Sequence, residues 1–243
     1  MKLENKVAVI TGGTRGIGKG IAEEFLKEGA RVAICGISEE KLKETLSELS
    51  SKFGRCIGSL VDVRIETQIS KFVKEVLEKY ERIDILVNNA AVAIPKNVVD
   101  FSNEDWSLTI DTNLTGTFLF TREVLPHMIK NSYGRIINIS SCLGKNSTAG
   151  LAAYSASKFG VIGLSLSLAK EVRSYGINVN VICPDRVDTK MARGTVSNED
   201  FSKWLQPCDI AKAALFLAND EDSNNITGST IDVYANFGNP IFK

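Results

Sequence analysis

A tyrosine and a lysine stand four positions apart in the stretch "AAYSASKFG", at Tyr154 and Lys158. A free phenol ionises near pH ~10, so it is nearly inert as an acid or base in neutral water. On a helix, residues four apart share one face, and a nearby ammonium lowers the pKa of a phenol because it favours the phenolate. Such a lysine makes the tyrosine usable as a general acid or base. Taken alone, the spacing is more typical of an ordinary polar pair on an exposed helix face, and the residues around it are what favour catalysis.

Other polar residues precede this pair. Ser140 and Ser141 stand at the end of an apolar run that begins at Gly134. A hydroxyl at that point can hydrogen-bond a substrate carbonyl, although serines that follow strands more often form turns. Asn113 lies inside a helical pattern, where asparagine is a poor helix former. It marks either a local kink in the helix or a side chain that faces water.

The elements that must position these side chains follow a regular alternation. Short runs rich in Val and Ile predict strands at 6–11, 31–36, 55–61, 83–88, 134–140, 177–183 and 229–233. Amphipathic stretches between them predict helices at about 17–29, 39–52, 66–80, 103–131, 152–175 and 208–219. Strict alternation indicates an α/β fold in which a doubly wound parallel sheet of about seven strands has helices on both faces. We expect residues 1–243 to form a single Rossmann-type domain, because no linker or repeat interrupts the pattern.

Composition excludes several classes of protein. The chain has 243 residues, 44% of them hydrophobic, and 29 basic side chains balance 29 acidic ones. A zero net charge gives no reason to expect a nucleic-acid partner, and no apolar run approaches the ~20 residues that cross a membrane. Five scattered cysteines without a C-x-x-C pair, and no signal-peptide pattern, predict a cytoplasmic protein. One histidine, His127, cannot build a His-rich site, so no metal is expected.

The glycine-rich stretch "TGGTRGIG" connects the first predicted strand to the first predicted helix. Gly12, Gly16 and Gly18 allow unusual backbone angles and a close approach to a pyrophosphate. The helix that follows offers free N–H groups and a partial positive charge to phosphates. A glycine triplet alone is a weak signal, but its place between a strand and a helix predicts a dinucleotide site.

The end of the second predicted strand bears on which dinucleotide is bound. NAD-binding folds often carry an acid there for the adenosine ribose, whereas this chain has Gly36, Ile37 and Ser38. Arg15 in the glycine loop can form a charge-assisted bond with the 2′-phosphate of NADP, or can be a solvated surface arginine. We therefore favour NADP(H) over NAD(H).

Together these motifs resemble the short-chain dehydrogenase/reductase family over essentially the whole chain, and most closely its 3-oxoacyl-(acyl-carrier-protein) reductase branch. The matching stretches are "TGGTRGIG" from Thr11, "DV" at Asp62, "NNAA" at Asn88, "ICPDRVDT" from Ile182, and a carboxyl end that includes "ITGSTIDV". Asn113, Ser141, Tyr154 and Lys158 match the catalytic tetrad of the family. Spacing selects Ser141 rather than Ser140.

The resemblance implies a role for each of these residues. Tyr154 would exchange a proton with the substrate oxygen, and Lys158 would lower its pKa and hold the nicotinamide ribose. Ser141 would orient the substrate oxygen, and Asn113 would hold a water that relays protons to Lys158. The cofactor-binding residues implied or expected are Gly12, Thr14, Arg15, Gly16, Ile17, Gly18, Ile37, Ser38, Asp62, Val63, Asn89, Ala90, Tyr154, Lys158, Pro184, Val187 and Thr189.

The chain departs from the family pattern at three places. Ala91 replaces the last glycine of N-N-A-G, Asp185 replaces the glycine of P-G, and "YANFGNP" stands where many relatives have a diglycine. None of these changes removes a reacting group, so they bear on substrate and turnover. The resulting hypothesis is an NADP(H)-dependent reductase of a ketone or 3-oxoacyl thioester, or the reverse alcohol dehydrogenase. The alternatives are an NAD-dependent polyol or hydroxysteroid-type dehydrogenase and a cofactor-binding sensor without turnover.

Two further expectations concern surfaces. Residues 184–207 lack clear periodicity and follow the carboxyl end of a strand, so we expect a mobile substrate-covering segment; a disordered surface loop is the alternative. Val92, Ile94, Met191 and Trp204 are expected to form a partly apolar wall for the small-molecule substrate. The helices at 103–131 and 152–175 carry apolar residues on several faces: Phe118, Phe120, Phe159, Val161 and Leu164. In the family such helices form a dimer, often doubled into a tetramer; packing within one subunit is the alternative.

Overall fold

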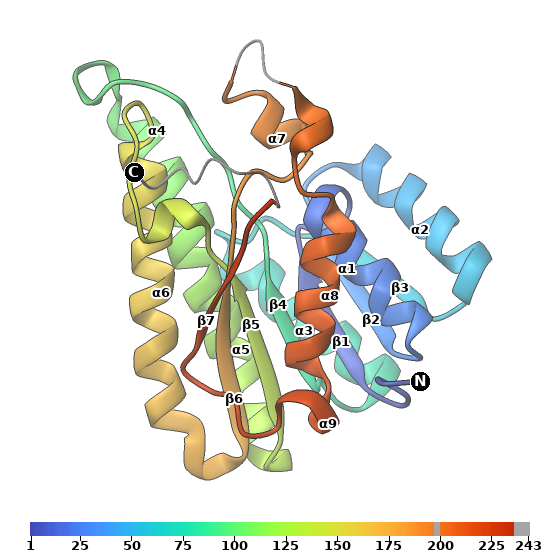
Figure 1. The fold of residues 1–243 in the computed structure, drawn as a ribbon. Coiled ribbons are helices and arrows are strands. Elements are labelled where there is room, and N and C mark those ends of the chain that lie inside the picture. The colour runs from blue at the N-terminus through green and yellow to red at the C-terminus, as the bar shows by residue number, and fades with distance from the viewer. Residues whose placement is uncertain (197–199, 236–243) are drawn as a thin grey trace.

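In the computed structural model, seven parallel strands form one sheet in the order β3-β2-β1-β4-β5-β6-β7 (Figure 1). The structure describes residues 1–196 and 200–235. The strands are β1 (Val7–Thr11), β2 (Arg31–Gly36), β3 (Cys56–Leu60), β4 (Ile85–Asn88), β5 (Gly134–Ile139), β6 (Ile177–Pro184) and β7 (Thr230–Val233). The predicted parallel sheet is confirmed.

Helices cover both faces of the sheet, and each face has its own apolar core. The helices are α1 (Gly16–Lys27), α2 (Glu39–Phe53), α3 (Glu66–Tyr80), α4 (Asn103–Ile110), α5 (Gly116–Asn131), α6 (Ala152–Val172), α7 (Lys190–Arg193), α8 (Pro207–Ala218) and α9 (Asp220–Ser223). One core packs α1, α2 and α8 against the sheet, and the other packs α3, α5 and α6 against it. Every residue of β1, β5 and β6 is buried, which explains why these strands are nearly continuous apolar runs.

The strand order creates the place for a ligand. Strand β1 lies between β2 and β4, so the chain runs outward from β1 in one direction to β3 and in the other to β7. The crossover helices that leave β1 and β4 therefore diverge, and a crevice opens at the carboxyl ends of these strands. The glycine loop, the "NNAA" stretch and the serines after β5 all lie at this edge of the sheet.

The helix predicted at 103–131 is confirmed as a helical segment, but it is not uniform. Residues Asp111–Thr115 form one wider π-helical turn between α4 and α5. Asn113, at the centre of that turn, is buried, so it marks a local distortion and does not face water. The helix predicted at 152–175 also ends earlier, because α6 stops at Val172 and a 3-10 turn, Arg173–Tyr175, leads to Gly176 with a φ of 71°.

The described residues of the stretch 184–207 contain more regular secondary structure than its lack of periodicity indicated. It contains α7 and a short 3-10 turn at Phe201–Lys203. Trp204 and Leu205 are buried, whereas Met191 is 38% exposed. Residues 197–199 of this stretch, and "NFGNP" at 236–240, lie outside the described residues. Its role as a mobile substrate cover stays a prediction. Within the described ranges, no helix combines the length and apolar character needed to cross a membrane.

Candidate active site

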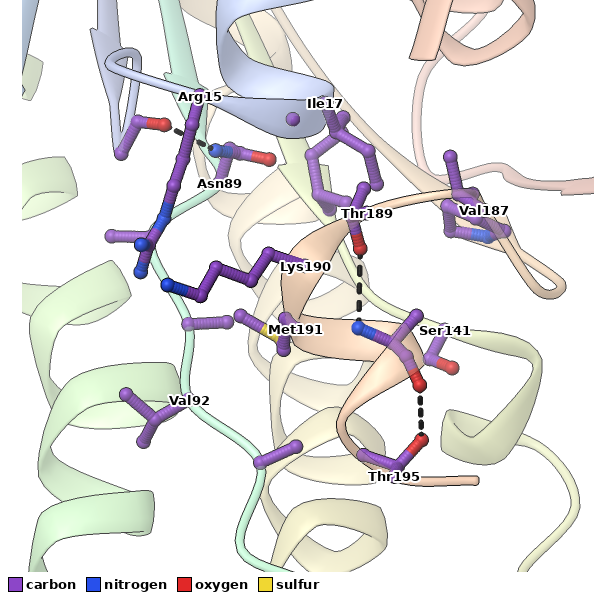
Figure 2. A pocket seen from close by; sticks show the side chains of 18 of the residues that line it. Arg15, Ile17, Asn89, Val92, Ser141, Val187, Thr189, Lys190, Met191 and Thr195 are labelled. Carbon is purple, nitrogen blue, oxygen red and sulfur yellow. Dashed lines mark hydrogen bonds between the residues drawn. The ribbon is translucent and has the colours of Figure 1, made fainter. Parts of the chain in front are cut away.

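A cavity of about 880 Å³ opens at the carboxyl edge of the sheet. Its wall begins at the glycine loop and the end of β2, passes the "NNAA" stretch, and reaches Tyr154 and the residues after β6. Figure 2 shows the part of this cavity between Arg15 on the glycine loop and Thr195 beyond α7. Of the residues predicted to be catalytic or to bind the cofactor, all but Gly18 and Asn113 line it.

The glycine loop has the backbone form that its sequence predicts. Gly12 and Gly16 adopt φ values of 63° and 54°, in the left-handed region that residues with side chains rarely occupy. Helix α1 then begins at Gly16 without a side-chain cap and without an acid in its first turn. Its first N–H groups therefore remain available to an anion in the cavity.

Asn89 braces the glycine loop from the neighbouring strand. Its amide nitrogen donates hydrogen bonds to the carbonyl oxygens of Thr11 at 2.9 Å and Gly12 at 3.2 Å (Figure 2 shows Asn89 beside the loop). The backbone N–H of Asn89 donates to the Thr11 hydroxyl at 2.9 Å. Gly18 serves the same packing: a side-chain carbon there would collide with the carbonyl oxygen of Gly12. Gly18 was expected to contact the cofactor, but the structure gives it a role in the close packing of the loop.

Where the cavity meets the carboxyl end of β2, its wall is formed by residues 36–38, none of which is acidic. Ile37 is 77% exposed, and the Ser38 hydroxyl caps α2 by accepting from the N–H of Lys41 at 3.4 Å. Asp62 lines the cavity, but its carboxylate is held by the Arg64 guanidinium at 2.5 Å, and this contact keeps the pKa of Asp62 below its usual value. Arg15 is the basic residue of the glycine loop at this site.

Tyr154, Lys158 and Ser141 meet at the other end, below the "NNAA" stretch. The Lys158 ammonium lies 5.6 Å from the centre of the Tyr154 ring and donates to the carbonyl oxygen of Ile139 at 2.8 Å. The Ser141 hydroxyl accepts from the N–H of Leu143 at 3.1 Å and also hydrogen-bonds Tyr154. The neighbouring Ser140 hydroxyl instead donates to the carbonyl oxygen of Lys158 at 2.9 Å. The structure therefore places Ser141, rather than Ser140, beside the phenol.

The expected lowering of the tyrosine pKa is wrong for the structure as it stands. Burial raises the pKa of Tyr154 to about 12, and the hydrogen bond with Ser141 offsets only part of that rise. Burial also lowers the pKa of Lys158 to about 8. The physical reason is desolvation, which shifts each of the two groups toward its neutral form.

Asn113 binds protein groups. Its side-chain oxygen accepts from the N–H of Val92 at 2.8 Å, and its amide nitrogen donates to the Val92 carbonyl at 2.9 Å and the Ser157 hydroxyl at 3.0 Å. These bonds join the loop after β4 to α6 at Ser157, the residue directly before Lys158. The structure thus gives Asn113 a bracing position behind the cavity wall. Its predicted part in holding a proton-relay water stays a prediction.

This geometry agrees with a comparison of the sequence with known families. The short chain dehydrogenase family model matches residues 6–200. The chain belongs to this family. It is an oxidoreductase of the short-chain dehydrogenase type, as its relatives indicate.

Individual relatives cover nearly the full length of this short-chain dehydrogenase. It is 42% identical over 241 residues to a 3-oxoacyl-(acyl-carrier-protein) reductase of Chlamydia muridarum, covering 95% of this chain and 96% of the relative. It is 38% identical to the (2S)-((R)-hydroxy(phenyl)methyl)succinyl-CoA dehydrogenase subunit BbsD of Thauera aromatica, with 96% of both chains covered. A crystal structure of a variant actinorhodin polyketide ketoreductase with NADPH superposes with a TM-score of 0.90 at 34% identity, covering 97% of this chain and 98% of that one.

The sequence predicts only part of the apolar lining of this cavity near Tyr154. Val92, Met191 and Trp204 line it as expected, whereas Ile94 does not, because the loop after β4 turns Ala93 and Pro95 to the cavity. The loop after β5 also contributes residues that the sequence analysis missed: Leu143, Thr148, Ala149, Gly150 and Leu151. The same rule that selected Ser141, a position beyond the carboxyl end of a parallel strand, would have found them.

Asp185 gives this wall a charge next to the reacting groups. It lines the cavity, and its carboxylate accepts from the Cys142 thiol at 3.7 Å. Burial and the carboxylate together raise the pKa of Cys142 to about 11, so the thiol is neutral at physiological pH. All five cysteines of the chain are unpaired. Among the described residues, no cluster of His, Cys, Asp or Glu side chains is arranged to hold a metal ion.

Proposed function

We propose that this short-chain dehydrogenase is an NADP(H)-dependent carbonyl reductase that converts a ketone to a secondary alcohol, with a 3-oxoacyl thioester as the substrate class to test first. One observation carries the proposal. Tyr154, Ser141 and Lys158 meet at one end of a cavity whose other end is an uncapped helix N-terminus behind a glycine loop.

The residues present fit a nicotinamide dinucleotide phosphate. The free N–H groups of α1 and the left-handed Gly12 and Gly16 form a cradle that a pyrophosphate can approach closely. At the adenosine end, no carboxylate stands at the tip of β2 to repel a 2′-phosphate, and Arg15 is at hand to pair with it. Pro184, Val187 and Thr189 line the opposite wall, next to Tyr154 and Lys158, where the nicotinamide half would lie.

The side chains divide the proton chemistry between them. When bound, the nicotinamide supplies or accepts the hydride. The raised pKa of Tyr154 keeps its phenol protonated at neutral pH, which is the state that can give a proton to a carbonyl oxygen during reduction. Lys158, with a pKa of about 8, carries its charge at neutral pH and stabilises the phenolate left behind. Ser141 orients the same oxygen by hydrogen bonding.

The substrate class rests on the relatives and on the wall of the cavity. Two of the relatives act, by name, on acyl groups carried as thioesters, and a third is a polyketide ketoreductase with NADPH. Val92, Leu143, Met191 and Trp204 offer a partly apolar surface next to Tyr154, which suits an acyl chain. The unpaired cysteines and the reductase relatives also support a cytoplasmic location.

The test is an assay of purified protein with NADPH or NADH against a panel of 3-oxoacyl thioesters and small ketones, followed at 340 nm. The proposal predicts that NADPH is consumed with at least one 3-oxoacyl thioester and that NADH supports a lower kcat/KM. Tighter binding and faster turnover with NADH would move the protein to the NAD-dependent alternative. Measurable NADPH binding without turnover on any substrate of the panel would favour a sensor.

A further inference from the structure

The cavity wall is rich in basic side chains, and most of them are engaged within the protein. Seven lysines and arginines line it: Arg15, Lys19, Lys41, Arg64, Lys158, Arg186 and Lys190. Lys19 pairs with Glu48, Lys41 with Glu44, and Arg64 with Asp62. Lys158 donates to the Ile139 carbonyl, and Arg186 lies 5.9 Å from the ring centre of Trp204. These five cations therefore have partners that account for their positions.

Arg15 and Lys190 are the exceptions. Neither side chain has a hydrogen bond, an ion pair or a ring contact with any residue in the ranges 1–196 and 200–235. Arg15 is the residue before α1, and Lys190 is the first residue of α7. Figure 2 shows the two side chains reaching from opposite walls toward the same part of the cavity.

The backbone holds these two residues close to each other. A side-chain carbon on Gly16 would lie 3.1 Å from the Cγ2 atom of Thr189, so the glycine loop and the start of α7 are in contact. Thr189 is itself fixed, because its hydroxyl caps α7 by accepting from the N–H of Ala192 at 3.2 Å (Figure 2). Arg15 and Lys190 are the direct neighbours of these contacting residues, so both must emerge at the same contact.

Two positive charges directed at one point repel each other unless an anion lies between them. The uncapped N–H groups of α1 open into the same cavity beside Arg15 and add a further partial positive charge. Within the described residues, neither cation has a carboxylate partner. A phosphate group, with its negative charge and several acceptor oxygens, satisfies both side chains at once.

We propose that Lys190 is a cofactor-binding residue that, together with Arg15, clamps a phosphate group of the dinucleotide between the glycine loop and α7. This inference rests on the proposed function, because it assumes that the cavity binds a nicotinamide dinucleotide. It adds the segment after β6 to the phosphate site. That segment also carries Met191, so the clamp couples cofactor binding to the substrate wall.

The test compares Lys190→Gln and Lys190→Arg with the parent protein by titrating NADPH and NADH with fluorescence detection. We expect Lys190→Gln to weaken binding about tenfold at low salt, the loss of roughly one charge-assisted hydrogen bond. Lys190→Arg keeps the charge and should restore most of the affinity. The difference between parent and Lys190→Gln should shrink at 0.5 M salt, because the screening length falls below 10 Å. Lys203→Gln is the matched control, since this lysine lies on the same segment but does not line the cavity.

A comparison of NADPH with NADH shows which phosphate group of the dinucleotide is clamped. Equal weakening of NADPH and NADH identifies the pyrophosphate as the clamped group, and weakening of NADPH alone identifies the 2′-phosphate. Unchanged affinity of Lys190→Gln for both cofactors overturns the inference while leaving the proposed function intact. Failure of the parent protein to bind either cofactor contradicts the proposed function instead.

Discussion

Lys158 is a cationic side chain in a buried position of the candidate active site. Its side chain is 3% exposed and its pKa falls to about 8, because burial penalises the ammonium. The ammonium donates one hydrogen bond, to the Ile139 carbonyl oxygen at 2.8 Å. In its charged form Lys158 therefore destabilises the folded protein. It nevertheless lies next to the phenol of Tyr154, where a positive charge can stabilise a phenolate.

Replacement of this lysine should therefore stabilise the fold while removing function. The folded-state pKa of about 8 lies below the ordinary value of 10.5, so the folded protein binds fewer protons between these pH values and its stability rises with pH there. The variant Lys158→Met has no such group, so its unfolding free energy lacks this rise with pH. We expect it to be more stable than the parent by up to about 3 kcal/mol below pH 8, with the gain disappearing toward pH 10.5.

Urea unfolding at pH 7, 8.5 and 10 measures this difference. Lys170→Met, an exposed lysine of the same helix, serves as the control and should leave stability nearly unchanged at every pH. A gain for Lys158→Met that stays constant across the three pH values would contradict the assigned pKa.

The proposed preference for NADPH can be tested at a single side chain at the end of β2. Gly36 is the other position at the end of β2, but a side-chain carbon there would lie 2.9 Å from the Thr14 Cγ2 atom, so a substitution would disturb the loop. Ile37 is 77% exposed and accepts a new side chain without crowding. Ile37→Asp should weaken NADPH about tenfold by like-charge repulsion and leave NADH within about threefold. Ile37→Asn controls for shape, and equal effects of both variants on NADPH would refute the charge argument.

At the scale of elements, the π-helical turn at Asp111–Thr115 is the feature that links the fold to the site. It carries Asn113 inward, where three hydrogen bonds tie the loop after β4 to α6. The same loop contributes Val92 to the cavity wall. The turn therefore fixes one wall of the cavity relative to the helix that carries Tyr154 and Lys158.

Asn113→Ala should loosen this wall. The variant leaves the backbone N–H and carbonyl of Val92 without their side-chain partner, which costs about 1–3 kcal/mol of unfolding free energy. The Ser157 hydroxyl loses one hydrogen bond but still donates to the Tyr154 carbonyl oxygen. We expect a matching loss in urea unfolding and a raised KM for substrate. Asn131→Ala, at the exposed end of α5, should change the unfolding free energy by less than about 0.5 kcal/mol. Equal stability of the two variants would show that Asn113 has no bracing role.

Elements were predictable from the sequence where local pattern decides them. The Val- and Ile-rich strands and the glycine loop were found correctly, because burial on both faces and left-handed glycines leave direct traces. The π-helical turn between α4 and α5 was not predictable in this way. Its Asn113 bonds Ser157, which lies 44 positions away in the sequence. The prediction of a lowered tyrosine pKa was wrong for a related reason. Helical spacing places two groups on one face of a helix but does not reveal how deeply they are buried.

For the whole molecule, the exposed aromatic residues of α4, α5 and α6 bear on the predicted homo-oligomer. Phe120 and Val161, expected to be available for a partner, are buried within the subunit; Phe120 packs on Phe72 with ring centres 6.4 Å apart. Phe118 and Phe159 remain 43% and 47% exposed on α5 and α6, and Trp106 is 48% exposed on α4. We propose that this aromatic face joins two copies of the chain in a homodimer or homotetramer.

Light scattering at several protein concentrations tests the assembly. The parent should show two or four times the mass of one chain. The double variant Phe118→Asp plus Phe159→Asp should shift toward the monomer, because it buries two charges at the contact. The matched control is Tyr175→Asp, since this tyrosine is 44% exposed but lies beyond the end of α6. A monomeric parent protein would exclude the assembly.

In the proposed reaction the Tyr154 phenol supplies the proton to the substrate oxygen beside a bound cofactor. The most direct measurement is single-turnover NADPH oxidation by Tyr154→Phe, with the NADPH dissociation constant measured on the same sample. Removal of one hydroxyl from a packed ring should leave the dissociation constant within about threefold and slow turnover by about 10²–10⁴-fold, the usual contribution of a general acid. Turnover within tenfold of the parent, with the cofactor still bound, would contradict the claim.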